Sequence, residues 1–425
     1  MGRHMSTTKP IVVYLHRYPP EIEAFQWPGM REVVGALAPV YELVYASMKP
    51  AAWARNDDLR RDLTMLEAPL AIDQADGRDK WIKTLRWYGY LGRMLERVRA
   101  LNPAVVICQE ALPWIPGQVA ALGFPTLIAT ADWWWSILLG DTRPGRWLAG
   151  RLEVRDVRSW NRPNVRATVC TEAGRRLLAA RGLQADKIDL VNMPRNPGMF
   201  RPLDPRPTKA ELGLEPGLKH VALFGIIRRG KGYEQLLGWW RGVAAKHPDW
   251  RLVIIGGGEG EGWCRREIRR LGLDGVVEMT GWIETKQEVN RRLNAMDALL
   301  VPRRNSPDNQ GAIPSALFNG LSTERPVVAT GLPSIAEVVR DGVDGFLYRP
   351  DDEESFRGAL EQALGDPEGA AAVGRAGHAR AAECFDPAKV GRTYRRLVDR
   401  LAQMGRPEGA KPETAGAGGA GLAGC

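Results

Sequence analysis

The sequence predicts an α/β protein of two domains, each built on a doubly wound parallel sheet. Three observations lead to this prediction. Short apolar runs typical of buried strands alternate with helical patterns along most of the chain. The chain has 425 residues, 44% of them hydrophobic, whereas a single core stops growing at roughly 250 to 300 residues. A proline-dense stretch, 193–207, interrupts the alternation and is expected to link the two domains.

The first domain is expected over residues 11–200. Its predicted elements, in chain order, are a strand at Ile11–Leu15, a helix at 80–101, strands at 104–108 and 126–129, a strand at 167–170 and a helix at 172–181. Strands that alternate with helices in this way are typical of a parallel sheet covered on both faces.

The second domain is expected over residues 201–380. Its predicted strands are 221–224, 252–255, 276–279, 298–301 and 326–329, with helices between them. A C-terminal helix is expected at 381–405. The last segment, 406–425, is rich in Gly, Ala, Pro and Glu and is expected to be disordered.

Composition narrows the class of protein. No stretch approaches the roughly 18 to 20 apolar residues of a membrane helix, and the N-terminus does not resemble a signal peptide. The five cysteines show neither paired nor metal-ligand spacing. We therefore expect a cytoplasmic protein without a structural zinc ion. Residues 1–5 resemble a cloning remnant and are left out of the fold prediction.

Positive charge is concentrated in the first half of the chain. The formal net charge is +9, and residues 81–166 hold twelve Lys or Arg against six Asp or Glu. Arg151, Arg155, Arg158 and Arg162 recur at helical spacing, which predicts one basic helix face. Such a face is either solvated or meets an anionic partner, which includes a membrane leaflet, a lipid pyrophosphate and a nucleic acid.

Glycine-containing turns follow the predicted strands of the second domain. Gly225 follows the first of these strands, where a missing side chain lets the backbone approach a ligand. Arg228 and Lys231 in the same loop supply positive charge for a diphosphate leaving group. Gly256, Gly257 and Gly258 end the next strand but do not complete the G-x-G-x-x-G fingerprint of dinucleotide sites, which disfavours a nicotinamide cofactor.

The order of these motifs resembles the retaining glycosyltransferases of GT-B architecture, family 4 (group 1). The resemblance covers most of residues 11–401. It rests on the segments Phe-Arg-Pro at 200–202, Phe-Gly-Ile-Ile-Arg at 224–228 with Lys-Gly at 231–232, Gly-Trp-Ile at 281–283, Ala-Met-Asp-Ala-Leu-Leu-Val-Pro at 295–302, Arg-Pro-Val-Val-Ala at 325–329, Glu-Val-Val at 337–339 and Gly-Val-Asp-Gly at 342–345. The resemblance implies two Rossmann-like domains facing each other across a cleft, with C-terminal helices packing back on the first domain.

The same resemblance implies a set of site residues. The N-terminal domain would bind the acceptor and the C-terminal domain would bind a nucleotide-diphosphate sugar as co-substrate, with no further cofactor and no metal. Donor-binding residues would be Gly225, Arg228, Lys231, Gly256, Gly257, Gly258, Trp282, Ile283, Arg303, Gln310, Gly311, Ala312, Ile313 and Asn319. Asp132, Arg228 and Lys231 would act in catalysis.

The sequence departs from the common family pattern at three positions. Two glutamates eight residues apart are usual before the Arg-Pro-Val-Val strand, and Gly311 and Asn319 stand in their places. Asn309-Gln310-Gly311 resembles a subset of the family that lacks the first glutamate. Ala131 stands where many relatives have a histidine, next to Asp132.

Aromatic residues near Asp132 are candidates for acceptor binding. Trp133 and Trp134 offer flat apolar faces that suit either pyranose rings or a membrane interface, although core packing is an alternative. His16, in the loop after the first strand, is a further candidate on the acceptor side.

The preferred hypothesis is a retaining, metal-independent hexosyltransferase of polysaccharide biosynthesis. Its acceptor would be a saccharide or a lipid-linked saccharide, with a possible peripheral contact to the inner membrane face. Three alternatives stay open: glycosylation of a modified base in nucleic acid, a non-catalytic pseudo-transferase that binds nucleotide sugars, and a sugar-nucleotide epimerase.

Overall fold

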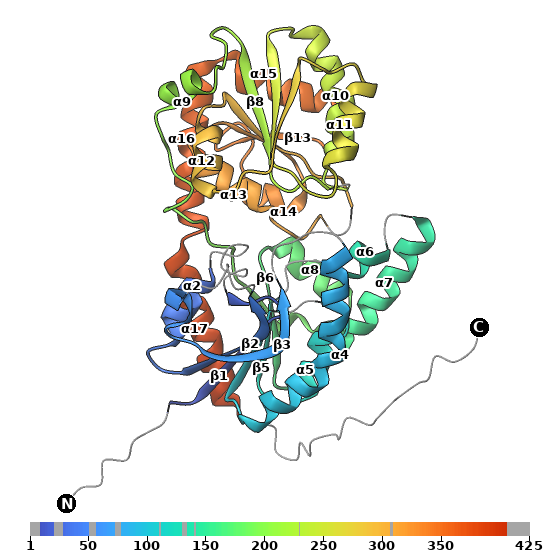
Figure 1. Cartoon of the computed structure of the whole chain (residues 1–425), viewed down its shortest axis with the longest axis vertical. Coiled ribbons are helices and arrows are strands. Elements are labelled where there is room, and N and C mark those ends of the chain that lie inside the picture. The colour runs from blue at the N-terminus through green and yellow to red at the C-terminus, as the bar shows by residue number, and fades with distance from the viewer. Residues whose placement is uncertain are drawn as a thin grey trace, which may run out of the picture.

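The computed structural model of the protein describes residues 9–20, 29–50, 57–72, 78–109, 112–129, 134–139, 142–228, 230–306 and 309–405. Within these ranges the chain folds into two α/β domains, which Figure 1 shows one above the other. The predicted segment 406–425 lies outside the described residues.

The N-terminal domain is built on a seven-stranded parallel sheet in the order β3-β2-β1-β4-β5-β6-β7. Its strands are β1 (Ile11–Leu15), β2 (Glu42–Pro50), β3 (Thr64–Ile72), β4 (Val105–Cys108), β5 (Thr126–Ala129), β6 (Val165–Val169) and β7 (Ile188–Leu190). Its helices are α2 (Met30–Leu37), α3 (Asp57–Arg60), α4 (Arg78–Ala100), α5 (Ile115–Ala120), α6 (Trp134–Leu139), α7 (Arg143–Arg158) and α8 (Glu172–Ala180), with a 3-10 turn at Ala185–Lys187.

The C-terminal domain repeats this topology with six parallel strands in the order β10-β9-β8-β11-β12-β13. Its strands are β8 (Lys219–Phe224), β9 (Trp250–Ile255), β10 (Val277–Gly281), β11 (Ala298–Val301), β12 (Val327–Thr330) and β13 (Phe346–Tyr348). Its helices are α9 (Pro205–Glu211), α10 (Tyr233–Lys246), α11 (Glu261–Arg270), α12 (Lys286–Asn294), α13 (Ser315–Leu321), α14 (Pro333–Ala336), α15 (Glu353–Gly365) and α16 (Pro367–Cys384).

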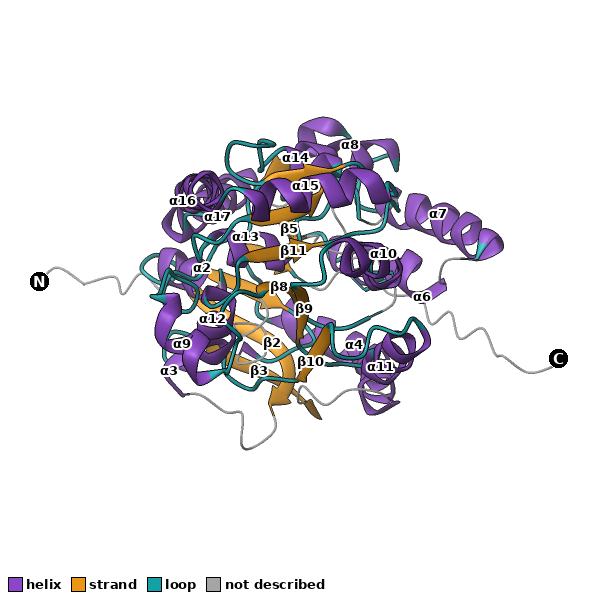
Figure 2. Ribbon diagram, turned by 90° about the horizontal axis from the view of Figure 1, so that it is seen from above, coloured by secondary structure: helices purple, strands orange, loops and turns teal. Residues whose placement is uncertain are grey.

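Both sheets reverse their strand order beside the first strand, which is the doubly wound arrangement. Apolar side chains cover the two faces of each sheet in separate clusters, so the helices lie on both faces, as Figure 2 shows from above. The predicted fold class is therefore confirmed: the protein has two Rossmann-like α/β domains.

The last helix, α17 (Pro387–Met404), returns to the N-terminal domain and packs beside α2. Val390, Tyr394, Val398 and Leu401 on its inner face are buried in the same apolar cluster as Val12 of β1. The chain therefore crosses from the first domain to the second and back again, as the fold class predicted.

Three differences from the prediction concern where helices begin or end. The basic helix α7 ends at Arg158, so Arg162 lies outside it; Arg162 precedes Pro163, a position that disfavours helical backbone. The proline-dense linker ends in α9, because Asp204 caps a helix whose first residue is Pro205. The helical segment expected at 381–405 is divided, since Asp386 caps a new helix at Pro387.

Candidate functional site

The loop between β8 and α10 holds the predicted basic pair. Gly225 has a φ of +126° and Gly232 a φ of +93°, both in the range that favours glycine. Between them, Arg228 and Lys231 are half-buried. Arg228 makes no hydrogen bond or ion pair with the described residues, so its guanidinium is available to an anionic ligand.

The carboxylate of Glu234 braces this loop from the first turn of α10. Its Oε1 accepts a hydrogen bond from the amide of Gly230 at 3.2 Å, and its Oε2 is buried with no partner among the described residues. The next residue after Gly232 is Tyr233. Burial raises the pKa of the Tyr233 hydroxyl, an effect that the positive charge of Arg303 partly opposes. Arg303 therefore adds positive potential at the base of the loop.

The second glycine loop, between β9 and α11, is joined to the first by backbone hydrogen bonds. The amide of Ile227 donates to Gly257 O at 2.8 Å, and the amide of Gly260 donates to Ile227 O at 3.0 Å. A Cβ atom on Gly256 would lie 2.1 Å from Gly225 O, so only glycine permits this approach. The glycines at 256–258 thus fix the basic loop in place in addition to any contact with a ligand.

A third loop, after β11, lies against the basic loop. Asn309 Nδ2 donates to Gly230 O at 3.4 Å and to Ser306 Oγ at 2.9 Å, and Asn309 is buried. The four amides that follow, those of residues 310–313, make no hydrogen bond with the described part of the chain. A row of unpaired amides next to two cationic side chains can receive an anion or a sugar hydroxyl.

Gly311 lies at the contact between the two domains. Its carbonyl accepts a hydrogen bond from Thr171 Oγ1 at 2.8 Å. A Cβ atom at position 311 would lie 2.7 Å from Leu177 Cδ1 and 3.1 Å from Gly174 Cα, both on α8. Helix α8 therefore occupies the space that a side chain at position 311 would need, which is a physical reason for glycine at this position.

Glu337 makes a second interdomain contact that sequence reasoning did not find. Its two carboxylate oxygens accept hydrogen bonds from the amides of Glu172 and Ala173, each at 2.7 Å. Arg176 lies 3.8 Å from the same carboxylate. A side chain of the C-terminal domain thus caps helix α8 of the N-terminal domain, where the helix dipole favours an anion.

The remaining predicted donor residues divide into core and surface positions. The side chain of Ile313 is buried in the apolar core, and that of Ile283 is half-buried against it. Trp282 is 53% exposed. Asn319 on α13 has a buried Oδ1 that accepts no hydrogen bond from the described residues, which leaves it free to accept one from a hydroxyl. The amide of Ala312 donates no hydrogen bond to the described residues, whereas its carbonyl accepts one from Ser334 Oγ at 2.9 Å.

On the N-terminal side, His16 is buried and its ring lies edge-on to Tyr18. Asp132 and Trp133 lie outside the described residues, and only the backbone of Trp134, the first residue of α6, is described. Trp135 is the third of these consecutive tryptophans, for which core packing was the alternative to a role in the site. It is buried and donates from Nε1 to Asp156 Oδ2 at 3.3 Å, so it belongs to the core beneath the loop.

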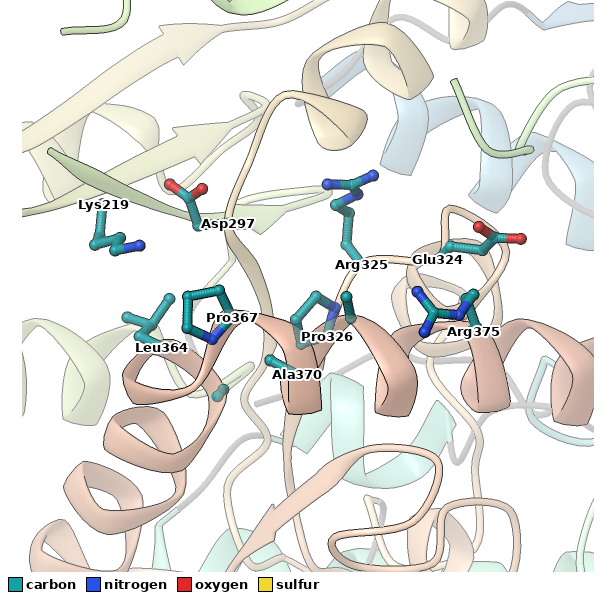
Figure 3. Close-up of a pocket in the computed structure, with 11 residues that line it drawn as sticks. Lys219, Asp297, Glu324, Arg325, Pro326, Leu364, Pro367, Ala370 and Arg375 are labelled. Atoms are coloured by element: carbon teal, nitrogen blue, oxygen red, sulfur yellow. The ribbon is translucent and has the colours of Figure 1, made fainter. Parts of the chain in front are cut away.

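A cavity of about 220 Å³ opens at the opposite end of the C-terminal sheet. Figure 3 shows four charged residues among those that line it: Lys219, which begins β8, Arg325, which precedes β12, Asp297 and Glu324. Because the predicted donor loops follow the carboxyl ends of the strands, this cavity is distinct from the candidate site.

Comparison with known proteins connects the C-terminal domain with a family. Residues 206–380 match the model of the family described as glycosyl transferases group 1. The D-inositol 3-phosphate glycosyltransferase of Segniliparus rotundus is 32% identical over 200 residues, which are 46% of this chain and 43% of that protein. The lipopolysaccharide core mannosyltransferase LpsB of Rhizobium meliloti is 26% identical over 191 residues, 43% of this chain and 52% of that protein. The aligned segment thus spans about half the length of these curated relatives.

Solved structures share the fold over more than nine-tenths of the chain. Sucrose-phosphate synthase from Thermosynechococcus elongatus superposes with a TM-score of 0.73 and 16% identity, over 93% of this chain and 100% of that one. Anabaena HepE in complex with UDP and glucose superposes with a TM-score of 0.67 and 15% identity, over 92% and 99%. The protein therefore has the GT-B fold, and its C-terminal domain is similar to the group 1 glycosyl transferases.

Proposed function

We propose that the protein is a retaining glycosyltransferase that moves a sugar from a nucleotide-diphosphate sugar to an acceptor hydroxyl. The observation that carries this proposal is the convergence of three loops at the carboxyl edge of the C-terminal sheet. Arg228, Lys231 and the unpaired amides of residues 310–313 come together there through the Asn309–Gly230 hydrogen bond. The matches to proteins named glycosyltransferases support the same reading.

In this proposal each group has a defined role. Arg228 and Lys231 neutralise the diphosphate as the bond between the anomeric carbon and the phosphate oxygen breaks. The amides of residues 310–313 donate hydrogen bonds to phosphate or sugar oxygens, and Asn319 Oδ1 accepts a hydrogen bond from a ribose hydroxyl. The acceptor oxygen forms its bond on the face that the phosphate leaves, and the departing phosphate oxygen takes the hydroxyl proton. The bond formed to the acceptor oxygen replaces the bond broken to the phosphate oxygen, and the acceptor proton passes to the nucleotide diphosphate that leaves. The step therefore needs no further reactant.

The proposed acceptor is a saccharide or a lipid-linked saccharide in cell-surface polysaccharide synthesis. Support comes from the lipopolysaccharide core mannosyltransferase among the relatives and from HepE, whose structure holds UDP and glucose. Asp132 is proposed to position the acceptor. No helix in the described part of the chain is long and apolar enough to cross a membrane.

The proposal is tested by a thermal-shift screen of nucleotides and nucleotide sugars, followed by a donor-turnover assay with the sugar that raises the melting temperature most. A ligand that binds the native state raises the midpoint by mass action. Arg228→Ala and Lys231→Ala are each expected to lower kcat/KM by about 10²- to 10³-fold, as is typical for loss of one charge-stabilising group.

The matched control is Arg241→Ala, which removes an exposed arginine of the neighbouring helix α10 and is expected to leave turnover unchanged. Nucleotide-sugar binding with no turnover, for any donor or acceptor, would instead identify a non-catalytic binding protein. An isomerised sugar released with free nucleotide, in the absence of acceptor, would identify an epimerase.

A further inference from the structure

Helices α6 and α7 form a helical pair on the outside of the N-terminal domain. The two helices pack against each other, and Figures 1 and 2 both show α7 projecting from the rest of the domain. Over residues 143–151 of α7 only Ala149 is buried. Apolar side chains on this projecting part are open to solvent: Trp147 is 64% exposed and Leu148 is 41% exposed. Leu138 at the end of α6 is 42% exposed.

The charged side chains of α7 are divided by sign between its two faces. All five arginines of the helix are exposed, namely Arg143, Arg146, Arg151, Arg155 and Arg158. Its two acidic residues, Glu153 and Asp156, are buried. The outward surface of the helix therefore carries only positive charge.

Both buried carboxylates have partners that hold α7 to the domain. Glu153 accepts a hydrogen bond from Arg181 of the α8 segment at 2.8 Å. Asp156 Oδ2 accepts from the amide of Trp114 at 2.9 Å and from Trp135 Nε1 at 3.3 Å. These contacts lie in the second half of α7, whereas most side chains of the first half are exposed.

The exposed apolar and basic side chains share one side of the helix. Arg143 and Arg151 lie one turn before and after Trp147, and the Arg151 guanidinium lies 5.0 Å from the centre of the Trp147 indole. Helices that lie in a membrane interface combine Trp and Leu with flanking Lys or Arg in this way. Indole rings favour the headgroup region, and the arginines match the negative charge of anionic lipids.

Helix α4 extends the apolar part of this surface. Leu85 is 69% exposed and Ile82 is 47% exposed near its N-terminal end. Both figures place α6 between α4 and α7. Because α4 follows β3 and α6 follows β5, these helices begin at the carboxyl edge of the sheet. That is the edge at which Thr171, after β6, contacts the C-terminal domain.

We infer that the α6–α7 surface, with Trp147 and Leu148 at its centre and exposed arginines around them, docks the protein on an anionic lipid bilayer. The inference deepens the proposed function, on which its biological meaning rests, because it brings the acceptor-binding edge of the N-terminal domain close to a lipid-linked hydroxyl. The docking surface itself does not depend on catalysis.

The inference is tested by flotation of the full chain with two kinds of vesicle. One is made of phosphatidylcholine alone, and in the other about one lipid in three is phosphatidylglycerol. Binding is expected only to the anionic vesicles and is expected to weaken with salt. Each basic residue near an anionic surface strengthens binding about fivefold. The triple variant Arg143→Gln, Arg151→Gln, Arg155→Gln is therefore expected to lower the partition coefficient by about 100-fold, and Trp147→Ser with Leu148→Ser by at least tenfold.

The matched control is Arg241→Gln, Arg266→Gln, Arg269→Gln, which removes the same charge from exposed positions of the C-terminal domain. It is expected to retain most of the binding. Equal losses in the two triple variants, or no flotation of the wild type, would overturn the inference. Binding to duplex DNA would also overturn the inference if it is stronger than binding to vesicles, depends on the arginines and is unchanged by the Trp147 and Leu148 substitutions. That result would identify a nucleic-acid surface. Unchanged melting temperatures show that the variants are folded, and donor binding, measured separately, tests the proposed function independently.

Discussion

At the scale of single residues, Gly311 shows how the absence of a side chain allows two domains to touch. Its carbonyl binds Thr171, and its Cα faces the backbone of Gly174 on α8. A larger residue there would have to push α8 away or force Leu177 into another rotamer. The glycine at position 311 and the interdomain contact therefore have one physical cause.

Gly311→Glu is expected to destabilise the protein by about 1 to 3 kcal/mol, because inserting a side chain into a packed contact forces shifts of its neighbours. Urea unfolding followed by circular dichroism measures this change. Gly238→Glu is the control, since a Cβ atom at that exposed position of α10 meets no atom within 4 Å. Unchanged stability of Gly311→Glu would show that α8 and the loop after β11 are not in contact in solution.

At this scale the sequence indicates the chemistry of a residue but not its neighbours in space. The basic pair, the glycine turns and Asn319 were assigned to a donor site from residue type and order, and they remain predictions for binding. Ile283 and Ile313 were assigned to the donor site as parts of loops whose backbone would meet the ligand, and their side chains pack in or against the apolar core. Nothing in the sequence marked Glu234 as a site residue except its position in the first turn of α10.

At the scale of elements, helix α8 depends on both domains for its N-terminal hydrogen bonds. Thr171 Oγ1 accepts from the amide of Gly174 at 2.9 Å, while the amides of Glu172 and Ala173 donate to Glu337. A helix N-terminus must find partners for these amides. Glu337 therefore contributes to helix capping and to the relative placement of the domains.

Glu337→Ala is expected to cost about 1 to 2 kcal/mol, because it removes charge-assisted hydrogen bonds at a helix N-terminus. Hydrogen exchange detected by mass spectrometry should show faster exchange in the peptide that contains residues 172 and 173. Glu368→Ala changes an exposed glutamate in the first turn of α16 and should leave that peptide unaffected. Equal protection in the Glu337→Ala variant would contradict the capping role.

Four observed strands were not predicted from the sequence, namely β2, β3, β7 and β13. β7 and β13 have only three residues each, and β3 contains Pro69, which argues against a strand when read alone. In the sheet β3 is an edge strand, where proline is tolerated, and its pairing with β2 shifts register between Met48 and Lys49. The strands at the centre of each sheet, which are short and uniformly apolar, were predicted within a few residues of their observed bounds.

At the scale of the whole molecule, α17 makes the C-terminus part of the N-terminal core. Leu401 and Val398 are fully buried beside residues from β1, α2 and β2. Tyr41 donates a 2.6 Å hydrogen bond to Asp399, a contact between residues 358 positions apart. Loss of this helix would expose the apolar face of the first domain as well as that of the helix itself.

Leu401→Ala is expected to destabilise the N-terminal domain by about 2 to 5 kcal/mol, the usual cost of a buried leucine. The matched control is Leu360→Ala, which makes the same change at a fully buried position in the C-terminal core. Unfolding of a two-domain protein need not be two-state, so calorimetry should show different transitions shifted by the two variants. A shift of the same transition, to the same extent, would contradict the assignment of α17 to the N-terminal core.

The sequence by itself determined the alternation of strands and helices, the two-domain α/β class and the positions of the glycine-rich basic loops. These features depend on local periodicity, turn residues and residue type. Only the tertiary structure decided that α8 fills the place of a side chain at Gly311 and that Glu337 caps α8. The same holds for the division of charge between the two faces of α7. Contacts such as Thr171–Gly311 and Glu172–Glu337 join residues 140 and 165 positions apart, and no local pattern encodes which distant surfaces the path of the chain brings together.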